Sequence, residues 1–110
     1  METSIQDWVL WAIADDYESL EIILEEVNKW LPRRRRRITR QQVIRALQRL
    51  TRQGSAQAYL LSPSPPHAQV SFSLRDIDDL WFYVTPKGKD LVKQLVESRG
   101  GPPLGKLNQK

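Results

Sequence analysis

The sequence predicts an α+β fold in which three helices precede a β-hairpin and a fourth helix follows it. Three observations favour this order. Apolar residues recur at helical spacing as far as Gly54, the period then shortens toward two in aromatic-rich segments, and Thr85-Pro86 begins another helix. We therefore expect one domain over residues 1–98 and a flexible tail over residues 99–110, where Gly-Gly-Pro-Pro precedes a polar end.

The first two helices are predicted from apolar stripes and from residues that can cap them. One stripe predicts a helix over residues 4–14, with Thr3 and Gln6 at capping-box spacing. Asp15-Asp16 then offers a new N-cap. A second stripe follows and predicts a helix that ends before Pro32, because proline cannot continue it.

The third helix is predicted over residues 40–53. Thr39 is suited to cap its start, and Gly54 is suited to end it because glycine accepts positive φ. Its inward side is one apolar stripe: Val43, Leu47 and Leu50.

Strands are predicted where the spacing of apolar residues shortens from the helical period toward two. Residues 56–61 and 80–84 are the two strands of a hairpin, and the second is dense in aromatic residues. The long connection between them contains Ser-Pro-Ser-Pro-Pro and an optional extra strand at 70–74. The last helix is predicted over residues 86–98, with Thr85 as its N-cap.

Charge is divided unevenly along the chain, although the net charge is only +4. Residues 1–31 hold eight acids against one lysine, whereas residues 32–57 hold nine arginines and no acid. Such asymmetry favours binding of a polyanion on one face.

Three segments resemble the winged helix-turn-helix DNA-binding superfamily. Residues 39–54, Thr-Arg-Gln-Gln-Val-Ile-Arg-Ala-Leu-Gln-Arg-Leu-Thr-Arg-Gln-Gly, look like its recognition helix, and a strand follows that glycine. Residues 82–91, Phe-Tyr-Val-Thr-Pro-Lys-Gly-Lys-Asp-Leu, are similar to the Tyr-x-Leu-Thr-x-x-Gly-x-x-x-Leu stretch of MarR-like and PadR-like transcriptional regulators. The resemblance covers about residues 4–98. It implies three helices, a β-hairpin wing and a C-terminal helix.

The chain departs from those regulators in two ways. It has no room for the long dimerisation helices that they usually add. Its wing is also acidic, since Arg75 is the only base between Ser55 and Val84. We therefore expect its tip to carry three acids: Asp76, Asp78 and Asp79.

The resemblance implies that the third helix lies in the major groove of double-stranded DNA. Arginine pairs with guanine and glutamine with adenine, and residues near the start of such a helix usually reach the bases. The expected base contacts are Arg40, Gln41 and Arg45. The expected backbone contacts are Arg33, Arg34, Arg35, Arg36, Arg37, Thr39, Arg49 and Arg52.

These features predict a DNA-binding transcriptional regulator. We expect a cytoplasmic homodimer, formed through the first helix, the last helix or both, that associates with the nucleoid if the host is bacterial. Two alternatives stay open: a winged-helix module that binds protein, favoured by the acidic first helices, and a binder of RNA or single strands. The arginine run is also compatible with a solvated turn or a nuclear localisation signal.

The composition argues against an enzyme or a metalloprotein. The chain has no cysteine and a single histidine, His67, and it shows no phosphate-binding glycine loop. No cofactor is expected, no apolar run reaches the ~18 residues of a membrane span, and an effector ligand is not identified. The tryptophans are expected to be core residues, although Trp11 lies off its stripe and a half-exposed contact role is the alternative.

Overall fold

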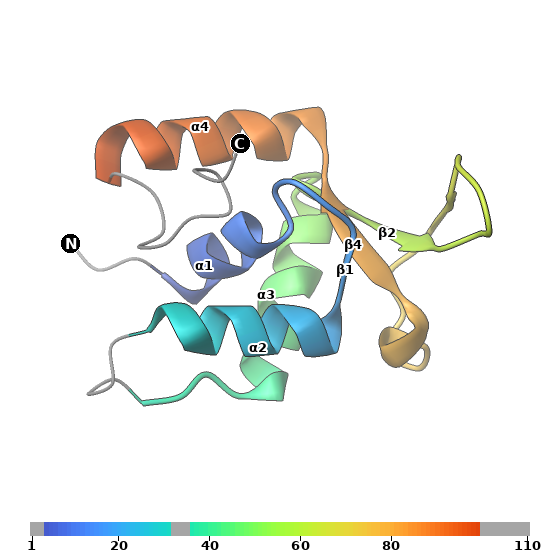
Figure 1. Cartoon of the computed structure of the whole chain (residues 1–110), viewed down its shortest axis with the longest axis horizontal. Helices are drawn as coiled ribbons and strands as arrows, with labels where there is room; N and C mark the ends of the chain where they lie inside the picture. Colours follow the sequence, from blue (N-terminus) through green and yellow to red (C-terminus); the bar gives the residue numbers. More distant parts are fainter. Residues whose placement is uncertain (1–3, 32–35, 100–110) are drawn as a thin grey trace.

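The computed structural model describes residues 4–31 and 36–99. Over these residues the chain forms four α-helices, one 3-10 helix and a four-stranded antiparallel sheet (Figure 1). In chain order the elements are α1 (Ile5–Ala12), β1 (Glu18–Ser19), α2 (Leu20–Trp30), α3 (Arg40–Arg52), β2 (Ala56–Leu60), β3 (Ala68–Val70), η1 (Ile77–Asp79), β4 (Trp81–Val84) and α4 (Pro86–Arg99). The predicted α+β class is confirmed, and β1 and η1 are additions to the predicted order of elements. Arg99 belongs to α4, and the rest of the predicted tail lies outside the described residues.

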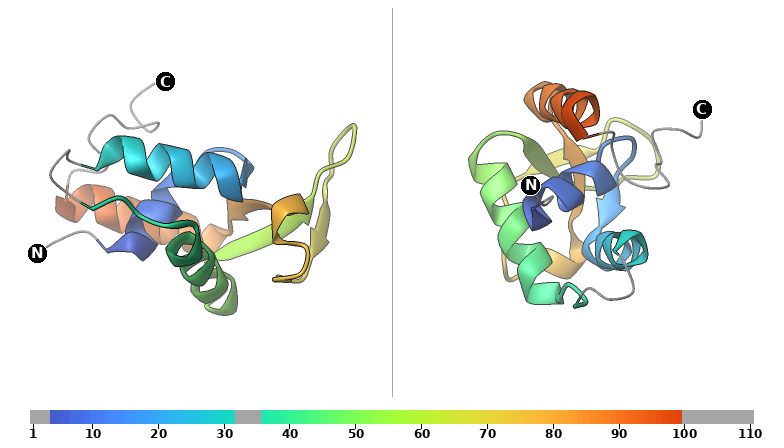
Figure 2. Two further views of the ribbon diagram at one scale, coloured as in Figure 1. Left: turned by 90° about the horizontal axis from the view of Figure 1, so that it is seen from below. Right: turned by 90° about the vertical axis from the view of Figure 1, so that its left-hand side faces the viewer.

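The helices surround α1, and the hairpin between β2 and β3 projects away from them (Figure 1). The right-hand view of Figure 2 shows α1 enclosed by α2, α3 and α4. The helix with the most acidic sequence, α2, and the helix with the most basic one, α3, also pack against each other.

The caps of the first two helices differ from those predicted. The Asp7 N–H donates to Ser4 Oγ at 3.1 Å, so Ser4 caps α1, whereas Thr3 lies outside the described residues. The cap of α2 is Ser19, to which the Ile22 N–H donates at 3.4 Å, and not Asp15-Asp16. Ser19 is preferred because its extended backbone ends a strand and turns directly into the helix.

That strand, β1, was not predicted from the sequence. Its two residues pair with β4, Glu18 opposite Phe82 and Ser19 opposite Trp81. Two residues are too few to produce an alternating pattern, so the pairing depends on the tertiary fold. The predicted second strand, at 80–84, begins one residue later as β4 because Leu80 is the C-cap of η1.

The sheet has the strand order β1-β4-β2-β3. In β2, Ala56 lies opposite Val84 and Ala58 opposite Phe82, which turns the small buried side chains toward the helices. The optional strand predicted at 70–74 lies earlier in the chain, at Ala68–Val70, as β3. Phe72 lies beyond the end of β3, and its ring centroid is 6.2 Å from that of Phe82. The acids expected at the wing tip lie in and beside η1 instead, on the return to β4.

Tryptophans fill the space between α1 and α2. Trp11 is 1% exposed and its ring meets Trp8 edge to face, with 5.4 Å between centroids. Trp8 also packs against Trp30 at 5.8 Å. The core assignment of Trp11 is confirmed and the half-exposed alternative is wrong, because α1 is buried on nearly every side.

The segment that resembles the regulators joins α4 to the end of α3. Thr85 Oγ1 donates to the Gly54 carbonyl at 2.6 Å and accepts the Gly88 N–H at 3.1 Å. A Cβ at Gly88 would lie 2.1 Å from the Ser55 carbonyl oxygen, so only glycine fits this approach. The spacing of Thr85 and Gly88 thus locks the two helices together.

Candidate nucleic-acid interface

The third helix is fixed at its start by a capping box. The Thr39 hydroxyl accepts the Gln42 N–H at 3.2 Å, and the Thr39 N–H donates to Gln42 Oε1 at 2.9 Å. Gly54, at φ +79°, ends the helix as predicted, and the Ser55 N–H returns to the Leu50 carbonyl at 2.9 Å. The Thr39 O–H also donates to Gln42 Oε1 at 3.3 Å, so it is not a free donor for phosphate.

One side of α3 is core and the other is open to solvent. The predicted inward stripe is confirmed, and Ile44 and Ala46, which lie beside it in the sequence pattern, are buried with Val43, Leu47 and Leu50. The exposed polar side chains are Arg40, Gln41, Gln42, Arg45, Arg49 and Arg52, and Gln48 is half-buried at the border. Gln41, Arg45, Arg49 and Arg52, four of the predicted contact residues, therefore share one solvent-facing surface.

Three arginines on that surface keep their charge unopposed. Within the described residues, Arg45, Arg49 and Arg52 form no ion pair. Acids are absent from α3 itself, and the flanking groove lined by Ser4, Gln42, Arg45 and Arg49 contains none either. The surface is suited to an anionic partner because no internal carboxylate has to be displaced first.

Arg40 has a partner that the sequence did not reveal. Its Nη2 lies 2.6 Å from Asp78 Oδ1 in η1, and the two side chains are 50% and 77% exposed. At 100° per residue Arg40 also projects well to one side of Arg45. The first of the three predicted base contacts is thus turned toward η1, whereas Gln41 and Arg45 face solvent.

The arginine run is described only at its end. Arg33, Arg34 and Arg35 lie outside the described residues, and Arg36 is exposed. The Arg37 guanidinium donates to the Asn28 carbonyl at 2.5 Å, at the end of α2. A cation is favourable at that carboxyl end of a helix dipole, so Arg37 has a structural contact besides any role with DNA.

Asn28 anchors the segment that leads into α3. Its amide donates to the Ile38 carbonyl at 3.0 Å and its Oδ1 accepts the Ile38 N–H at 2.8 Å. Both backbone groups of a buried residue are thereby satisfied by one side chain. This pair sets the direction in which the chain enters the third helix.

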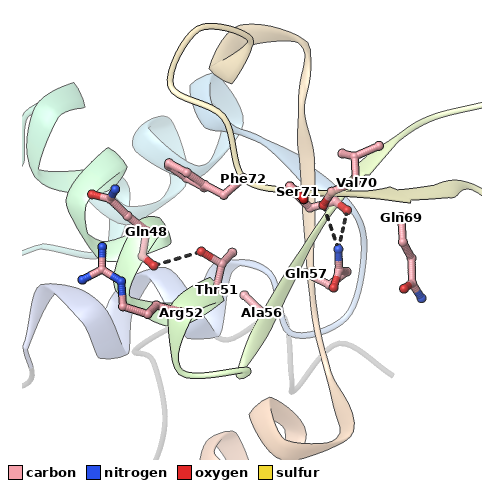
Figure 3. A pocket seen from close by; sticks show the side chains of 10 residues that line it. Gln48, Thr51, Arg52, Ala56, Gln57, Gln69, Val70, Ser71 and Phe72 are labelled. Atoms are coloured by element: carbon pink, nitrogen blue, oxygen red, sulfur yellow. Dashed lines mark hydrogen bonds between the residues drawn. The ribbon is translucent and has the colours of Figure 1, made fainter.

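A groove of about 570 Å³ lies beside α3 and was not foreseen from the sequence (Figure 3). One wall is the second half of α3 and the other is the edge formed by β2, β3 and Phe72. Figure 3 shows Gln48 and Arg52 on the helix side and Gln57, Gln69 and Ser71 on the strand side. Gln57 and Gln69 gave no signal in the sequence, since only the fold brings them to this groove.

The opposite face of the sheet carries a packed aromatic cluster. Tyr17 contacts Tyr59, His67 and Tyr83, with centroids 4.8–4.9 Å apart. Burial raises the pKa of Tyr59 above its ordinary 10.0, and the neighbouring tyrosines Tyr17 and Tyr83 raise it further. The cluster covers this face of the sheet.

Neither a metal centre nor a membrane span emerges from the part of the chain that the structure describes. No three potential ligand side chains of histidine, cysteine or acid type gather there. None of its helices has the length and apolarity to cross a bilayer.

Comparison with known proteins found no match: no family model fits the chain, and no curated protein or solved structure is similar to it. The function is therefore inferred from the residues and their geometry.

Proposed function

We propose that this protein is a DNA-binding transcriptional regulator with a winged helix-turn-helix fold. The observation that carries the proposal is the solvent-facing side of α3, where Gln41, Arg45, Arg49 and Arg52 stand without an acid. The element order supports it, because a helix pair leads into antiparallel strands and β1 closes the sheet against β4. The B-DNA major groove, ~12 Å wide, admits one α-helix.

The roles on α3 follow from position along the helix. Gln41 and Arg45 lie in its first half and are assigned to base edges, where an amide reads adenine and a guanidinium reads guanine. Arg49 and Arg52 lie in its second half and are assigned to phosphates, together with Arg36 before the helix. Arg40 joins the base contacts only if it leaves Asp78.

The direct test is fluorescence anisotropy of a labelled random-sequence duplex at about 50 and 200 mM salt. We expect binding that weakens steeply between the two concentrations, because phosphate contacts release condensed counterions. No binding at the lower concentration would contradict the proposal.

Base reading by Arg45 is tested against a charge-matched control. Arg45→Gln and Lys29→Gln each remove one positive charge from an exposed position, on α3 and on α2 respectively. With a site selected from a random library, Arg45→Gln should lose about 1–3 kcal/mol of discrimination between that site and random DNA. Lys29→Gln should keep the discrimination. Equal discrimination by both variants would remove Arg45 from the base contacts.

A protein partner is the second candidate function, and the surface of α2 favours it. Glu21 and Glu25 are exposed there. A module of this kind would not bind duplex DNA at about 50 mM salt. RNA or single-strand binding through the same arginines is distinguished from duplex binding by a competition experiment. If the protein binds single strands, unlabelled single strands should displace the labelled duplex at a lower concentration than unlabelled duplex does.

The homodimer is assigned to the outer surface of α4. A groove of about 390 Å³ there is lined by Ala14, Val92 and Val96, and Val96 is 36% exposed. Lys93 and Glu97 are one turn apart along one flank of it. A two-fold antiparallel pairing of α4 would bring each Lys93 near the Glu97 of the other copy.

Sedimentation equilibrium at tens of micromolar should give about twice the chain mass of 12.8 kDa. Val96→Glu places a carboxylate in the centre of that surface and should give a monomer. Leu74→Glu makes the same kind of change at a 58% exposed site in the connection between β3 and η1 and should leave the dimer intact. A monomeric wild-type protein, or a dimer that both variants preserve, would exclude this interface.

A further inference from the structure

A second groove, of about 370 Å³, lies where α1, the end of α3 and the second half of α4 meet, and we call it the α1–α4 groove. Its apolar lining consists of four leucines: Leu10, Leu50, Leu91 and Leu95. The first two are buried, whereas Leu91 and Leu95 are only half-buried against the core. The described residues therefore leave part of the apolar surface of α4 uncovered.

The α1–α4 groove is separate from the surface assigned to the homodimer. At about 100° per residue, the α4 residues that line it share one side of the helix: Leu91, Gln94, Leu95 and Ser98. Val92, Lys93 and Val96 line the dimer surface on the other side. Pairing of two copies through α4 would thus leave the α1–α4 groove open.

The chain that follows α4 starts beside this groove. Ser98 lines the groove and Arg99 ends the helix. From Ser98 back to Leu91 the groove follows α4 for about 10 Å. If two residues reverse the direction of the chain, the next three can cover about 10 Å. Residue 104 can therefore reach the two half-buried leucines of α4.

The sequence of this segment fits such a path. Gly100-Gly101 permits a tight reversal because glycine adopts positive φ at little cost. Pro102-Pro103 favours a polyproline II path, in which the backbone makes no internal hydrogen bonds. Leu104 comes next and is the first large apolar side chain after α4.

The polar residues of the α1–α4 groove complement this segment. Within the described residues the Gln94 side-chain amide makes no hydrogen bond, so it can donate to a polyproline II carbonyl. Gln53 Oε1 accepts from Gln6 at 3.2 Å, which leaves the amide N–H groups of Gln53 for another acceptor. Charge matches as well. Asp7 is the only charged residue lining the groove, whereas the charged residues in 100–110 are two lysines, Lys106 and Lys110.

We propose that residues 102–104 fold back into the α1–α4 groove and that the Leu104 side chain packs on Leu91 and Leu95. Composition predicts a flexible tail over residues 99–110, and the groove supplies an apolar contact that composition does not show. The segment then connects α1, the end of α3 and α4. The inference is independent of DNA binding, because its tests use the free protein.

The first test removes the apolar anchor. Leu104→Asp is compared with Asn108→Asp, which adds the same charge to the same segment without removing an apolar side chain. We expect Leu104→Asp to lower the melting temperature by about 4 °C or more and Asn108→Asp to change it by less than ~1 °C. Equal melting temperatures for the two variants would overturn the proposal.

The second test locates the segment. The chain has no cysteine, so Gly105→Cys can carry a single nitroxide. The nuclear magnetic resonance signal of the Gln53 side-chain amide, in the α1–α4 groove, should be broadened. The backbone amide of Ala14, which lines the dimer surface, should keep its intensity. Adding Leu104→Asp to the nitroxide-bearing chain should restore the Gln53 signal.

Two results of the second test would overturn the proposal. Equal broadening of Gln53 and Ala14 would mean that the segment does not bind in the α1–α4 groove. The other result comes from mixing isotope-labelled chains that lack the nitroxide with unlabelled chains that carry it. Broadening of Gln53 in that mixture would mean that the segment binds a second copy instead of folding back.

Discussion

Arg40 and Asp78 are 38 residues apart in sequence and 2.6 Å apart in the fold. The pair is largely exposed, so it contributes at most about 1 kcal/mol to stability. Its importance is positional, because it keeps a guanidinium at the start of α3 turned away from the surface that carries Arg45. Side-chain pairing of this kind is not visible in a sequence, which is why Arg40 was grouped with Gln41 and Arg45.

Removing Asp78 should release Arg40. Asp78→Asn is compared with Asp79→Asn, which removes the same charge from the adjacent exposed residue. We expect Asp78→Asn to raise duplex affinity at about 50 mM salt several-fold more than Asp79→Asn does. Identical gains would mean that only net charge matters and that the ion pair has no separate effect.

Gly88 is predicted to be essential for stability. Gly88→Ala would bring a Cβ 2.1 Å from the Ser55 carbonyl oxygen and should lower the free energy of unfolding by about 1–3 kcal/mol. Gly54→Ala meets only the cost of positive φ in open space, roughly 1–2 kcal/mol. Urea unfolding measures both, and an unchanged midpoint for Gly88→Ala would contradict the close approach.

At the scale of elements, helices were predictable and short strands were not. The start of α3 could be found because Thr39 and Gln42 form a local capping box, and its end because Gly54 is one of few residues suited to positive φ. By contrast β1 has two residues, and its pairing with β4 joins distant segments. The groove beside α3 escaped prediction for the same reason, since its two walls come from different parts of the chain.

The connection between α2 and α3 depends on Asn28. Asn28→Ala leaves the buried N–H and carbonyl of Ile38 without their partner and should cost about 1–3 kcal/mol of unfolding free energy. Gln6→Ala removes an exposed side-chain hydrogen bond to Gln53 and should cost well under ~1 kcal/mol. Thermal unfolding compares them, and equal melting temperatures would show that Asn28 does not hold this connection.

At the scale of the molecule, the exposed basic and acidic side chains lie on different helices. The arginines are on α3 and the glutamates Glu21 and Glu25 are on α2, and these two helices pack against each other as well as against α1. An approaching polyanion would be attracted to the exposed side of α3 and repelled by the exposed side of α2, which orients the encounter before contact. The basic surface was predictable from the charge count, because the basic block falls within α3 and the segment before it.

The arginine run should add affinity without adding specificity. With residues 33–36 changed from arginine to glutamine, Arg37 keeps its contact to Asn28. The salt slope should become shallower by about 3 to 4, whereas the preference for a selected site over random DNA should persist. Anisotropy titrations across salt concentrations measure both quantities. An unchanged slope would assign the run to a role other than phosphate binding.

The junction of Thr85 with Gly54 has a mechanical consequence. Because Thr85, just before α4, donates to the carbonyl of Gly54, just after α3, we expect the two helices to move together. If two copies pair through α4, the crossing angle of that pair sets the distance between the two α3 helices. DNA half-sites recur about one helical turn apart, so a small rotation at the α4 pair would move both α3 helices into or out of step with the duplex.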